Sequence, residues 1–268
     1  MIVFPNCKIN LGLKIIRKRT DGYHDLETVF FPLSLTDVLE VIEDQKGNDI
    51  TFTQSGLNIS GPANANLCIK AYRLLKKQFP DLPPTLMHLH KVIPMGAGLG
   101  GGSSDGAYAL RVLNDKYNLG ADLEKLLELA LQLGSDCPFF ILNKPCLATG
   151  RGEIMEPVPL DLSAYRFALV HPGIHISTAE AFSGITPAPN PMPLKDILQL
   201  PIEDWKHHLV NDFEQSVFIR HPELAEIKQS LYNAGAIYAS MSGSGSSFYG
   251  IFPNGEIVWE SKFKMILV

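Results

Sequence analysis

A glycine-rich stretch constrains the fold of this chain more than any other feature. It reads P-M-G-A-G-L-G-G-G-S-S-D-G-A over residues 94–107, and six of these fourteen residues are glycine. Glycine lacks a Cβ atom, so the backbone there can take positive φ angles and come close to a ligand. Successive backbone N–H groups can then converge into an anion-binding nest. The stretch therefore predicts a loop that binds a phosphate group.

We expect a helix to follow this loop. Ser103 and Ser104 are good N-cap residues, and residues 104–118 have an apolar side. A helix N-terminus after a glycine loop suits phosphate, because its N–H groups and the helix dipole favour the same negative charge. A flexible linker is the alternative, but a linker would not usually lie between an apolar strand and a well-formed helix. The stretch lacks the G-K-[ST] ending of a Walker A loop, and its glycines are too dense for a dinucleotide fingerprint.

Length and composition limit the class of protein. A chain of 268 residues, of which 46% are hydrophobic, suits one large domain or two lobes with a substantial core. No apolar run approaches the ~20 residues of a transmembrane helix, and the N-terminus lacks the parts of a signal peptide. The net charge of −5 argues against nucleic acid as a partner. We expect a cytoplasmic protein with a small-molecule ligand and no membrane partner; its oligomeric state stays open.

The chain contains four cysteines and no C-x-x-C spacing. This argues against a zinc or redox site and favours reduced thiols, most of them small buried residues. His88 and His90 could together bind a metal ion, but no third ligand is near them in the sequence. We therefore expect both to be exposed positions of a strand over residues 85–93, with Met87 and Leu89 facing inward.

Hydrophobic periodicity predicts the other elements. In the first part we expect strands at residues 7–16, 26–33, 37–43 and 49–53, helices at 64–79 and 122–133, and a hairpin of residues 139–142 and 146–150. Composition loosens near residues 157–161, where we place a soft boundary, with one lobe at 1–156 and the other at 157–268. In the second part we expect strands at 166–171, 236–241 and 247–252, and helices at 202–209, 212–220 and 222–233. Ser177 and Glu180 form a predicted capping box at a further helix start.

Three other features point to chemistry. Lys8 lies in an apolar strand, where a charged side chain needs a partner. Asp136 lies between a helix end and a proline, where an aspartate is often only a turn residue. Together they suggest an ion pair in which the lysine keeps a carboxylate ionised to act as a base. The S-G-S-G-S loop at residues 242–246 is either a tight hairpin or a second backbone approach to the ligand of the first loop.

Three segments resemble the GHMP kinase superfamily, named for galactokinase, homoserine, mevalonate and phosphomevalonate kinases: an N-terminal strand with a lysine, a central P-x-x-x-G-L-G-x-x-S-S loop and a late G-S-G loop. Five stretches carry a closer resemblance to one branch of the superfamily. They are C-K-I-N-L at 7–11, R-T-D-G-Y-H-D-L at 19–26, P-M-G-A-G-L-G-G-G-S-S at 94–104, G-S-D-C-P-F-F at 134–140 and M-S-G-S-G-S-S at 241–247. The second and fourth of them are similar to the branch of the superfamily that phosphorylates a cytidine diphosphate sugar alcohol in isoprenoid precursor synthesis. The resemblance implies an α+β, two-lobed GHMP kinase fold. Its N-terminal lobe would resemble the second domain of a small-ribosomal-subunit protein, and its C-terminal lobe would be ferredoxin-like.

The resemblance also implies roles for individual residues. Lys8 and Asp136 would be the catalytic pair. ATP and Mg²⁺ are implied as cofactors, with the metal ion on the ATP phosphates and helped by Ser103 or Ser104; its ligands otherwise stay unknown. The implied ATP-binding residues are Asn66, Pro94, Met95, Gly96, Ala97, Gly98, Leu99, Gly100, Gly101, Gly102, Ser103 and Ser104. The implied substrate-binding residues are Asn10 at the sugar-alcohol end, and Tyr23, His24, Thr178 and Phe182 at the cytidine end.

The match is incomplete, and two other functions stay open. The family usually has alanine where Cys7 stands and often valine where Cys137 stands, and residues 183–210 match poorly. One alternative is another GHMP small-molecule kinase of the mevalonate or homoserine type, against which the D-G-Y-H segment argues. The other is a nucleotide-binding regulatory protein without catalysis, against which the presence of both Lys8 and Asp136 argues.

Overall fold

The computed structural model describes residues 1–47, 49–59 and 61–268. Within these ranges the chain forms two compact units and passes between them several times. Unit 1 comprises Met1–Cys7, Ser34–Met95 and Gly100–Lys144, and unit 2 comprises Lys8–Leu33, Gly96–Leu99 and Pro145–Val268. The predicted lobes at 1–156 and 157–268 are a division along the sequence, and they stay a prediction.

Unit 1 contains a four-stranded sheet in the order β1-β4-β6-β5. Its strands are β1 (Ile2–Val3), β4 (Val38–Glu43), β5 (Ile50–Gly56) and β6 (Thr85–Lys91). Side chains alternate between the two faces of a strand. Met87 and Leu89 are accordingly buried and His90 is exposed, as the sequence predicts, whereas His88 is half-buried rather than exposed. One face of the sheet thus belongs to the core and the other faces solvent.

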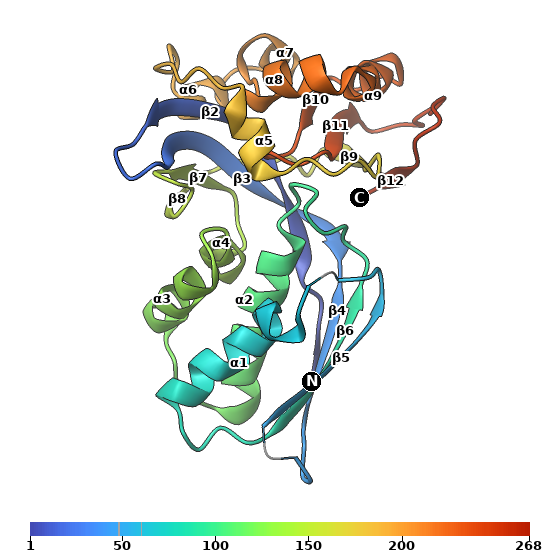
Figure 1. The fold of residues 1–268 in the computed structure, drawn as a ribbon. Coiled ribbons are helices and arrows are strands. Elements are labelled where there is room, and N and C mark those ends of the chain that lie inside the picture. The colour runs from blue at the N-terminus through green and yellow to red at the C-terminus, as the bar shows by residue number, and fades with distance from the viewer. Residues whose placement is uncertain (48, 60) are drawn as a thin grey trace. The chain divides into compact units, whose positions relative to one another are not determined.

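Four helices complete unit 1 (Figure 1). They are α1 (Leu67–Gln78), preceded by a 3-10 turn at Ala63–Ala65, α2 (Gly101–Tyr117), α3 (Leu123–Leu133) and α4 (Cys137–Leu142). Helices α1 and α2 lie side by side on one face of the sheet, and α3 and α4 pack on α2. The predicted hairpin at 139–142 is wrong, because these residues are helical. Pro138 at the first turn of α4 is compatible with a helix start, and Phe139 and Phe140 are fully buried.

Unit 2 contains two four-stranded sheets, ordered β2-β3-β7-β8 and β10-β11-β9-β12. The strands of the first are β2 (Asn6–Lys18), β3 (His24–Thr36), β7 (Cys146–Thr149) and β8 (Ile154–Pro157). Those of the second are β9 (Tyr165–Val170), β10 (Tyr238–Met241), β11 (Phe248–Pro253) and β12 (Met265–Leu267). The strands predicted around the S-G-S-G-S loop are confirmed as β10 and β11.

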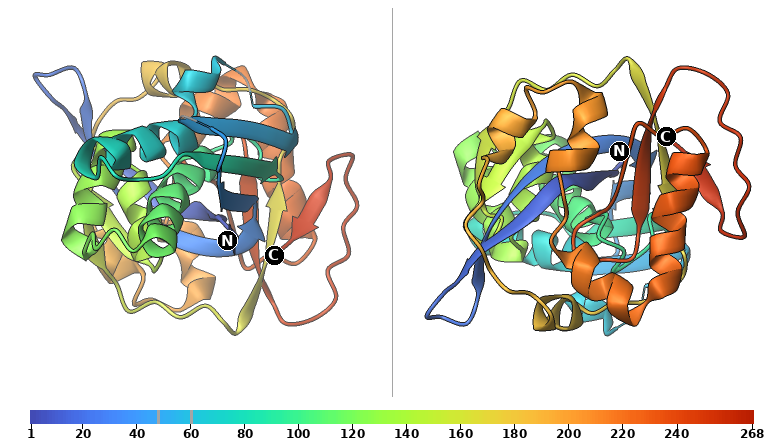
Figure 2. Two further views of the ribbon diagram at one scale, coloured as in Figure 1. Left: turned by 90° about the horizontal axis from the view of Figure 1, so that it is seen from below. Right: turned by 90° about the horizontal axis from the view of Figure 1, so that it is seen from above.

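The helices of unit 2 are α5 (Thr178–Ser183), α6 (Leu194–Ile197), α7 (Trp205–His208), α8 (Phe213–Arg220) and α9 (Pro222–Asn233), with a 3-10 turn at Ile202–Asp204. Helices α8 and α9 pack together, and α9 covers strands β10 and β11 (Figure 2). Val217, Leu231 and Phe248 are among the buried residues of this core. Ser177 caps α5 by accepting from the Glu180 N–H over 3.1 Å, as predicted.

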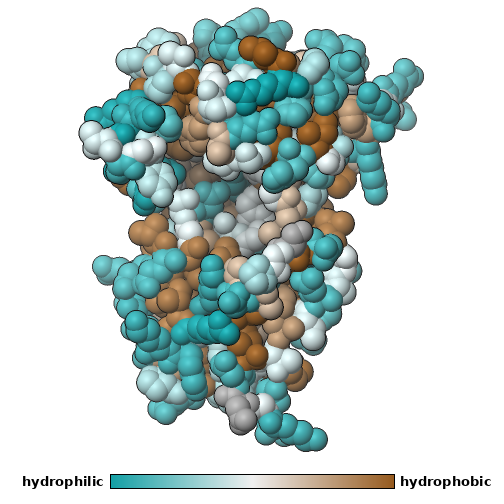
Figure 3. Space-filling model, viewed as in Figure 1, coloured by the Kyte–Doolittle hydropathy of each residue, from teal (hydrophilic) through white to brown (hydrophobic). Residues whose placement is uncertain are grey.

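Hydrophilic residues predominate on the face shown in Figure 3, with hydrophobic residues between them. Exposed apolar side chains are normal on a globular surface, and Ile219, at 79% exposure, is the most exposed large one on the described part of the chain. None of the helices formed by the described residues has both the length and the apolar character that crossing a bilayer requires.

Candidate active site

The glycine-rich loop connects β6 to α2. Gly96, Gly98 and Gly100 have φ angles of +65°, +78° and +69°, in the left-handed region that favours glycine. Gly100 is the N-cap of α2 and makes no side-chain cap. The predicted cap at Ser103 or Ser104 is therefore wrong, because the left-handed turn at Gly100 lets the helix begin earlier. Both serines lie in its first turn.

The S-G-S-G-S loop approaches the first loop inside unit 2, which was one of the two alternatives. A Cβ atom on Gly98 would lie 1.9 Å from the Ser242 carbonyl oxygen, and one on Gly245 would lie 2.2 Å from the Gly98 nitrogen. The Ser242 hydroxyl donates to the Gly98 carbonyl over 2.8 Å. The two loops are therefore in direct backbone contact, at a distance that only glycine permits.

Lys8 lies beside this contact. Its side chain is buried, and its ammonium group donates to Asn10 Oδ1 over 2.6 Å and to the Gly98 carbonyl over 3.1 Å. It also lies 4.9 Å from the centre of the Phe30 ring, within cation–π range. Asn10 in turn donates to Thr28 Oγ1 over 2.9 Å. The structure thus brings together Lys8, Asn10 and the segment Gly96–Leu99 among the predicted site residues.

Asn211 and Thr28 belong to this cluster, although the sequence analysis missed both. Asn211 donates to the carbonyls of Met241 and Gly243 over 2.8 and 2.9 Å, and its Oδ1 accepts from the Phe213 N–H. It therefore holds both ends of the peptide segment that includes Ser242. An isolated asparagine before a predicted helix carries no spacing signal, so only the fold identifies this role.

Asp136 belongs to unit 1, at the N-cap position of α4. The Ser135 hydroxyl donates to its Oδ1 over 3.4 Å. The next residue, Cys137, is fully buried, and burial raises the pKa of its thiol to about 12. The thiol is therefore protonated and unreactive at neutral pH. Lys8 belongs to unit 2, and its pairing with Asp136 stays a prediction.

Unit 1 also holds the start of α1, where the adenine side of a nucleotide site is expected. Asn66 caps α1 by accepting from the Cys68 N–H over 2.9 Å. A Cβ atom on Gly106 would lie 2.8 Å from Leu67 Cβ, so the starts of α1 and α2 pack closely. Pro94 and Met95 lead from β6 toward α2 in the same unit.

The start of α2 is suited to an anion and a cation together. The first N–H groups of a helix have no partner within the helix and favour negative charge. The Ser104 hydroxyl is fully buried and has no hydrogen-bond partner among the described residues. An orphaned hydroxyl at a helix start fits a phosphate oxygen or a magnesium ligand. The described residues contain no cluster of three or more His, Cys, Asp or Glu side chains that could hold a metal ion by themselves.

Of the residues predicted at the cytidine end, His24 and Phe182 are in contact. Their rings are stacked with centroids 4.6 Å apart, and Phe213 packs edge-on against Phe182 at 4.8 Å. Thr178 Oγ1 lies 3.5 Å from Ser244 Oγ, so the helix start of α5 adjoins the S-G-S-G-S loop. All of these residues lie in unit 2. Two stacked flat rings, one at the start of β3 and one in α5, are a suitable platform for a base.

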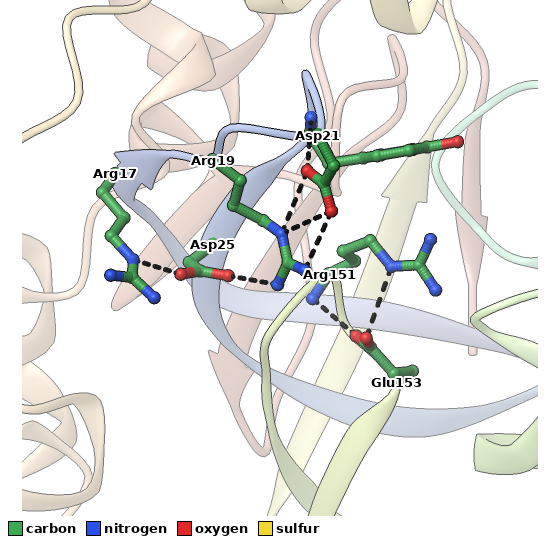
Figure 4. A network of polar contacts seen from close by, with 7 residues as sticks. Arg17, Arg19, Asp21, Asp25, Arg151 and Glu153 are labelled. Atoms are coloured by element: carbon green, nitrogen blue, oxygen red, sulfur yellow. Dashed lines mark hydrogen bonds and ion pairs between the residues drawn. The ribbon is translucent and has the colours of Figure 1, made fainter.

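Tyr23 lies in the turn between β2 and β3 and is 57% exposed. Its N–H donates to Asp21 Oδ1 over 3.1 Å, and Asp21 pairs with Arg19. The Arg151 guanidinium lies 5.0 Å from the centre of its ring. Figure 4 shows these groups within a wider network, in which Arg17 and Arg19 contact Asp25 and Arg151 contacts Glu153. The turn that presents Tyr23 is thus held by charged hydrogen bonds.

Models of known families match two segments of the chain. The GHMP kinases N terminal domain matches residues 66–144, and the GHMP kinases C terminal domain matches residues 195–258. The first segment contains the starts of α1 and α2 with Asp136, and the second contains Asn211 and the S-G-S-G-S loop.

Curated relatives match nearly the whole chain. A protein of Azobacteroides pseudotrichonymphae genomovar. CFP2 is 53% identical over 94% of this chain and 93% of its own length. One of Bacteroides fragilis is 52% identical over 98% of this chain and 96% of its own length. Both carry the name 4-diphosphocytidyl-2-C-methyl-D-erythritol kinase.

Solved structures match the fold. A crystal structure of 4-(cytidine 5'-diphospho)-2C-methyl-D-erythritol kinase has a TM-score of 0.80 and 34% identity, over 94% of this chain and 90% of that one. The mevalonate kinase of Methanococcus jannaschii has a TM-score of 0.73 at 15% identity, over 100% of this chain and 97% of that one, and shows the fold alone. The predicted α+β, two-lobed GHMP kinase fold is confirmed. The models of both GHMP kinase domains match this chain, and relatives that are 52–53% identical match almost its full length. This protein therefore belongs to the GHMP kinase family.

Proposed function

We propose that this protein transfers the γ-phosphoryl group of ATP to the 2-hydroxyl of 4-diphosphocytidyl-2-C-methyl-D-erythritol. The names of relatives such as that of Bacteroides fragilis support this substrate. The observation that carries it within the chain is the His24–Phe182 ring stack, because both residues are among those that the resemblance implies at the cytidine end. A kinase for a substrate without a base has no need of such a platform.

The nucleotide would be held by Asn66 and by residues 94–104. The N-terminus of α2 would bind phosphate oxygens through its N–H groups, and the left-handed glycines allow the close approach. A magnesium ion on the phosphates would neutralise charge that develops during transfer. Ser103 and Ser104 are the candidates to contact it, and the orphaned Ser104 hydroxyl supports this choice.

The catalytic pair would be Lys8 and Asp136. In this proposal Asp136 accepts the proton of the substrate hydroxyl, and the Lys8 ammonium keeps the carboxylate ionised. Support comes from the Lys8 side chain, which is buried and whose Nζ donates to the Gly98 carbonyl of the phosphate loop. Asn10, bonded to that ammonium, would contact the methylerythritol end of the substrate.

The cytidine would stack at Tyr23, His24 and Phe182, with Thr178 beside them. Base–aromatic stacking is worth roughly 1–3 kcal/mol per base. The exposed position of Tyr23 supports a role in binding rather than in core packing. A cytoplasmic location, which the sequence also suggests, stays a prediction.

An ADP-release assay with a panel of hydroxyl substrates tests this function. We expect turnover with 4-diphosphocytidyl-2-C-methyl-D-erythritol and none with mevalonate or homoserine. Turnover with either of the latter would favour the other small-molecule kinases of the family. ATP binding without turnover on any member of the panel would favour a non-catalytic nucleotide-binding protein.

A further inference from the structure

Three charged side chains lie buried together where β6 ends. The Lys91 ammonium is 2.5 Å from Asp37 Oδ2 and 2.7 Å from Asp105 Oδ2. The side chains of Lys91 and Asp37 have no exposed surface, and that of Asp105 keeps 5%. Burial of charges is costly, and apolar residues of similar size often stabilise a core equally well. Stability alone is therefore a weak reason for this cluster.

Each member of the cluster is tied to a different backbone segment of unit 1. Asp37 Oδ1 accepts from the N–H groups of Val92 and Ile93 over 2.6 and 2.8 Å, just where the chain leaves β6 for the glycine loop. Asp105 lies on α2, one turn after the residue Gly101 that begins the helix. The cluster thus joins the strand that enters the loop to the helix that leaves it.

The packing at Gly101 brings the cluster directly against the start of α2. A Cβ atom on Gly101 would lie 2.9 Å from Lys91 Nζ and 2.8 Å from Ile93 Cγ2. The Lys91 ammonium therefore packs against Gly101, the first residue of α2. The first N–H groups of this helix are the ones expected to bind the phosphate. The ammonium and Ile93 thus leave no room for a side chain at the start of α2.

We propose that Asp37, Lys91 and Asp105 are positioning residues that fix both ends of the glycine loop and thereby set its affinity for nucleoside diphosphates and triphosphates. This inference rests on the proposed nucleotide site. A hydrogen bond weakens steeply outside distances of about 2.7–3.2 Å, so a small displacement of the helix start loses phosphate contacts. The carboxylates of Asp37 and Asp105 fix the position of the Lys91 ammonium, and the ammonium packs against the start of α2.

The charge state of the cluster determines how it is tested. Burial raises the pKa of Asp105 to about 7, although the Lys91 ammonium opposes this. Burial lowers the pKa of Lys91, but the two carboxylates outweigh it and keep that pKa above its usual value. At pH 8 the Asp105 carboxyl is therefore mostly ionised and Lys91 stays protonated.

The test is the double variant Lys91→Met/Asp105→Leu, measured at pH 8. It removes one charge of each sign, so the net charge is kept, and it leaves Asp37 Oδ1 with its two backbone hydrogen bonds. Calorimetry should show ADP binding about tenfold weaker or more, the loss expected for one charge-assisted hydrogen bond. The affinity for CMP, whose expected site lies in unit 2, should change less than about twofold. In steady-state kinetics KM for ATP should rise more than kcat falls.

Thr85→Val is the matched control, at the other end of β6. The Thr85 hydroxyl is buried and contacts the Pro83 carbonyl at 3.0 Å and the Tyr117 hydroxyl at 3.1 Å. This variant should lower the melting temperature and leave ADP affinity unchanged. A double variant that binds ADP as tightly as the wild type overturns the positioning role. A wild type that does not bind ADP overturns the proposed nucleotide site instead.

Asp105→Asn decides the question if the double variant does not fold. It keeps the side-chain shape and one acceptor for Lys91 but removes the charge. ADP binding about threefold weaker or more, at an unchanged CMP affinity, supports the inference, since hydrogen bonds to charged groups exceed neutral ones in strength. Wild-type ADP affinity in this variant contradicts it.

Discussion

The Ser242 hydroxyl donates a 2.8 Å hydrogen bond to the carbonyl of Gly98, a residue 144 positions earlier in the chain. The Lys8 ammonium donates to the same oxygen over 3.1 Å. In a trans peptide the carbonyl and the following N–H point in opposite directions. The Leu99 N–H is therefore directed away from Lys8 and Ser242. One serine and one lysine thus set the direction of a donor in the phosphate loop.

Gly98→Ala should weaken nucleotide binding. The new Cβ would lie 1.9 Å from the Ser242 carbonyl oxygen, so the two loops would have to separate. We expect ADP affinity to fall at least about tenfold, since phosphate contacts depend on donor positions within a few tenths of an ångström. Calorimetry with ADP measures this.

Gly173→Ala is the control that introduces backbone strain without the clash expected at Gly98. Gly173 has the same φ of +78°, but nothing lies within 4 Å of its would-be Cβ atom. This variant should lose stability and keep ADP affinity. Equal losses of affinity in the two variants would contradict the contact between the loops as the cause.

Asp136→Asn tests the proposed base. Turnover should fall by about 10²–10⁴, the usual range for loss of a general base, because an amide cannot accept the proton. ADP and CMP affinities should change little. Single-turnover and steady-state rates measure the effect.

Asp122→Asn is the control for this change. Asp122 also begins a helix of unit 1, where its Oδ1 accepts from the Lys125 N–H over 2.9 Å. Asparagine caps a helix about as well as aspartate, so this variant should keep full activity. Near-wild-type turnover in Asp136→Asn would remove Asp136 from the mechanism.

Tyr23→Ala should weaken CMP binding about tenfold or more, as expected for a lost stacking contact. Tyr23→Phe keeps the ring, which the Arg151 guanidinium also faces, and should keep most of the affinity. ADP affinity should be unchanged in both variants. Titration that shows equal binding of CMP, UMP and AMP at this site would argue against a cytidine substrate.

The four cysteines should be inert in the native protein. Cys7, Cys68, Cys137 and Cys146 are all buried. Burial raises the pKa of Cys137 to about 12, so at pH 8 only on the order of one thiol in 10⁴ is ionised. Titration with a thiol reagent at pH 8 should therefore proceed no faster than the protein opens, and all four should react in urea. Rapid reaction of a native thiol would show that its burial is transient.

Several features follow from short stretches of sequence. The alternation in β6 identifies its buried face, and the caps at Ser177 and Asp122 occur where serine and aspartate predict helix starts. The glycine loop can be recognised in the sequence, because a backbone in the left-handed region of φ favours glycine. Each of these depends on residues within a few positions of one another, whose preferences are local.

Local preference failed where packing decided the outcome. Residues 139–142 suit a strand by composition, yet they belong to α4, because Phe139 and Phe140 are buried among the helices of unit 1. The Glu180 carboxylate, expected in a capping box, contacts His221 Nε2 at 3.0 Å instead. His221, 41 positions away in the sequence, thus takes the place of the helix N-terminus as the partner of this carboxylate.

Only the tertiary structure identified Asn211 as the anchor of the S-G-S-G-S loop, and Asp37, Lys91 and Asp105 as one cluster. The last three residues lie far apart in the sequence, and each looks like an ordinary surface charge there. Their pairing depends on where β4, β6 and α2 meet in the folded unit. A buried charge or backbone carbonyl bonds to a group that the fold brings within about 3 Å of it. The spacing of residues along the chain does not indicate which group that will be.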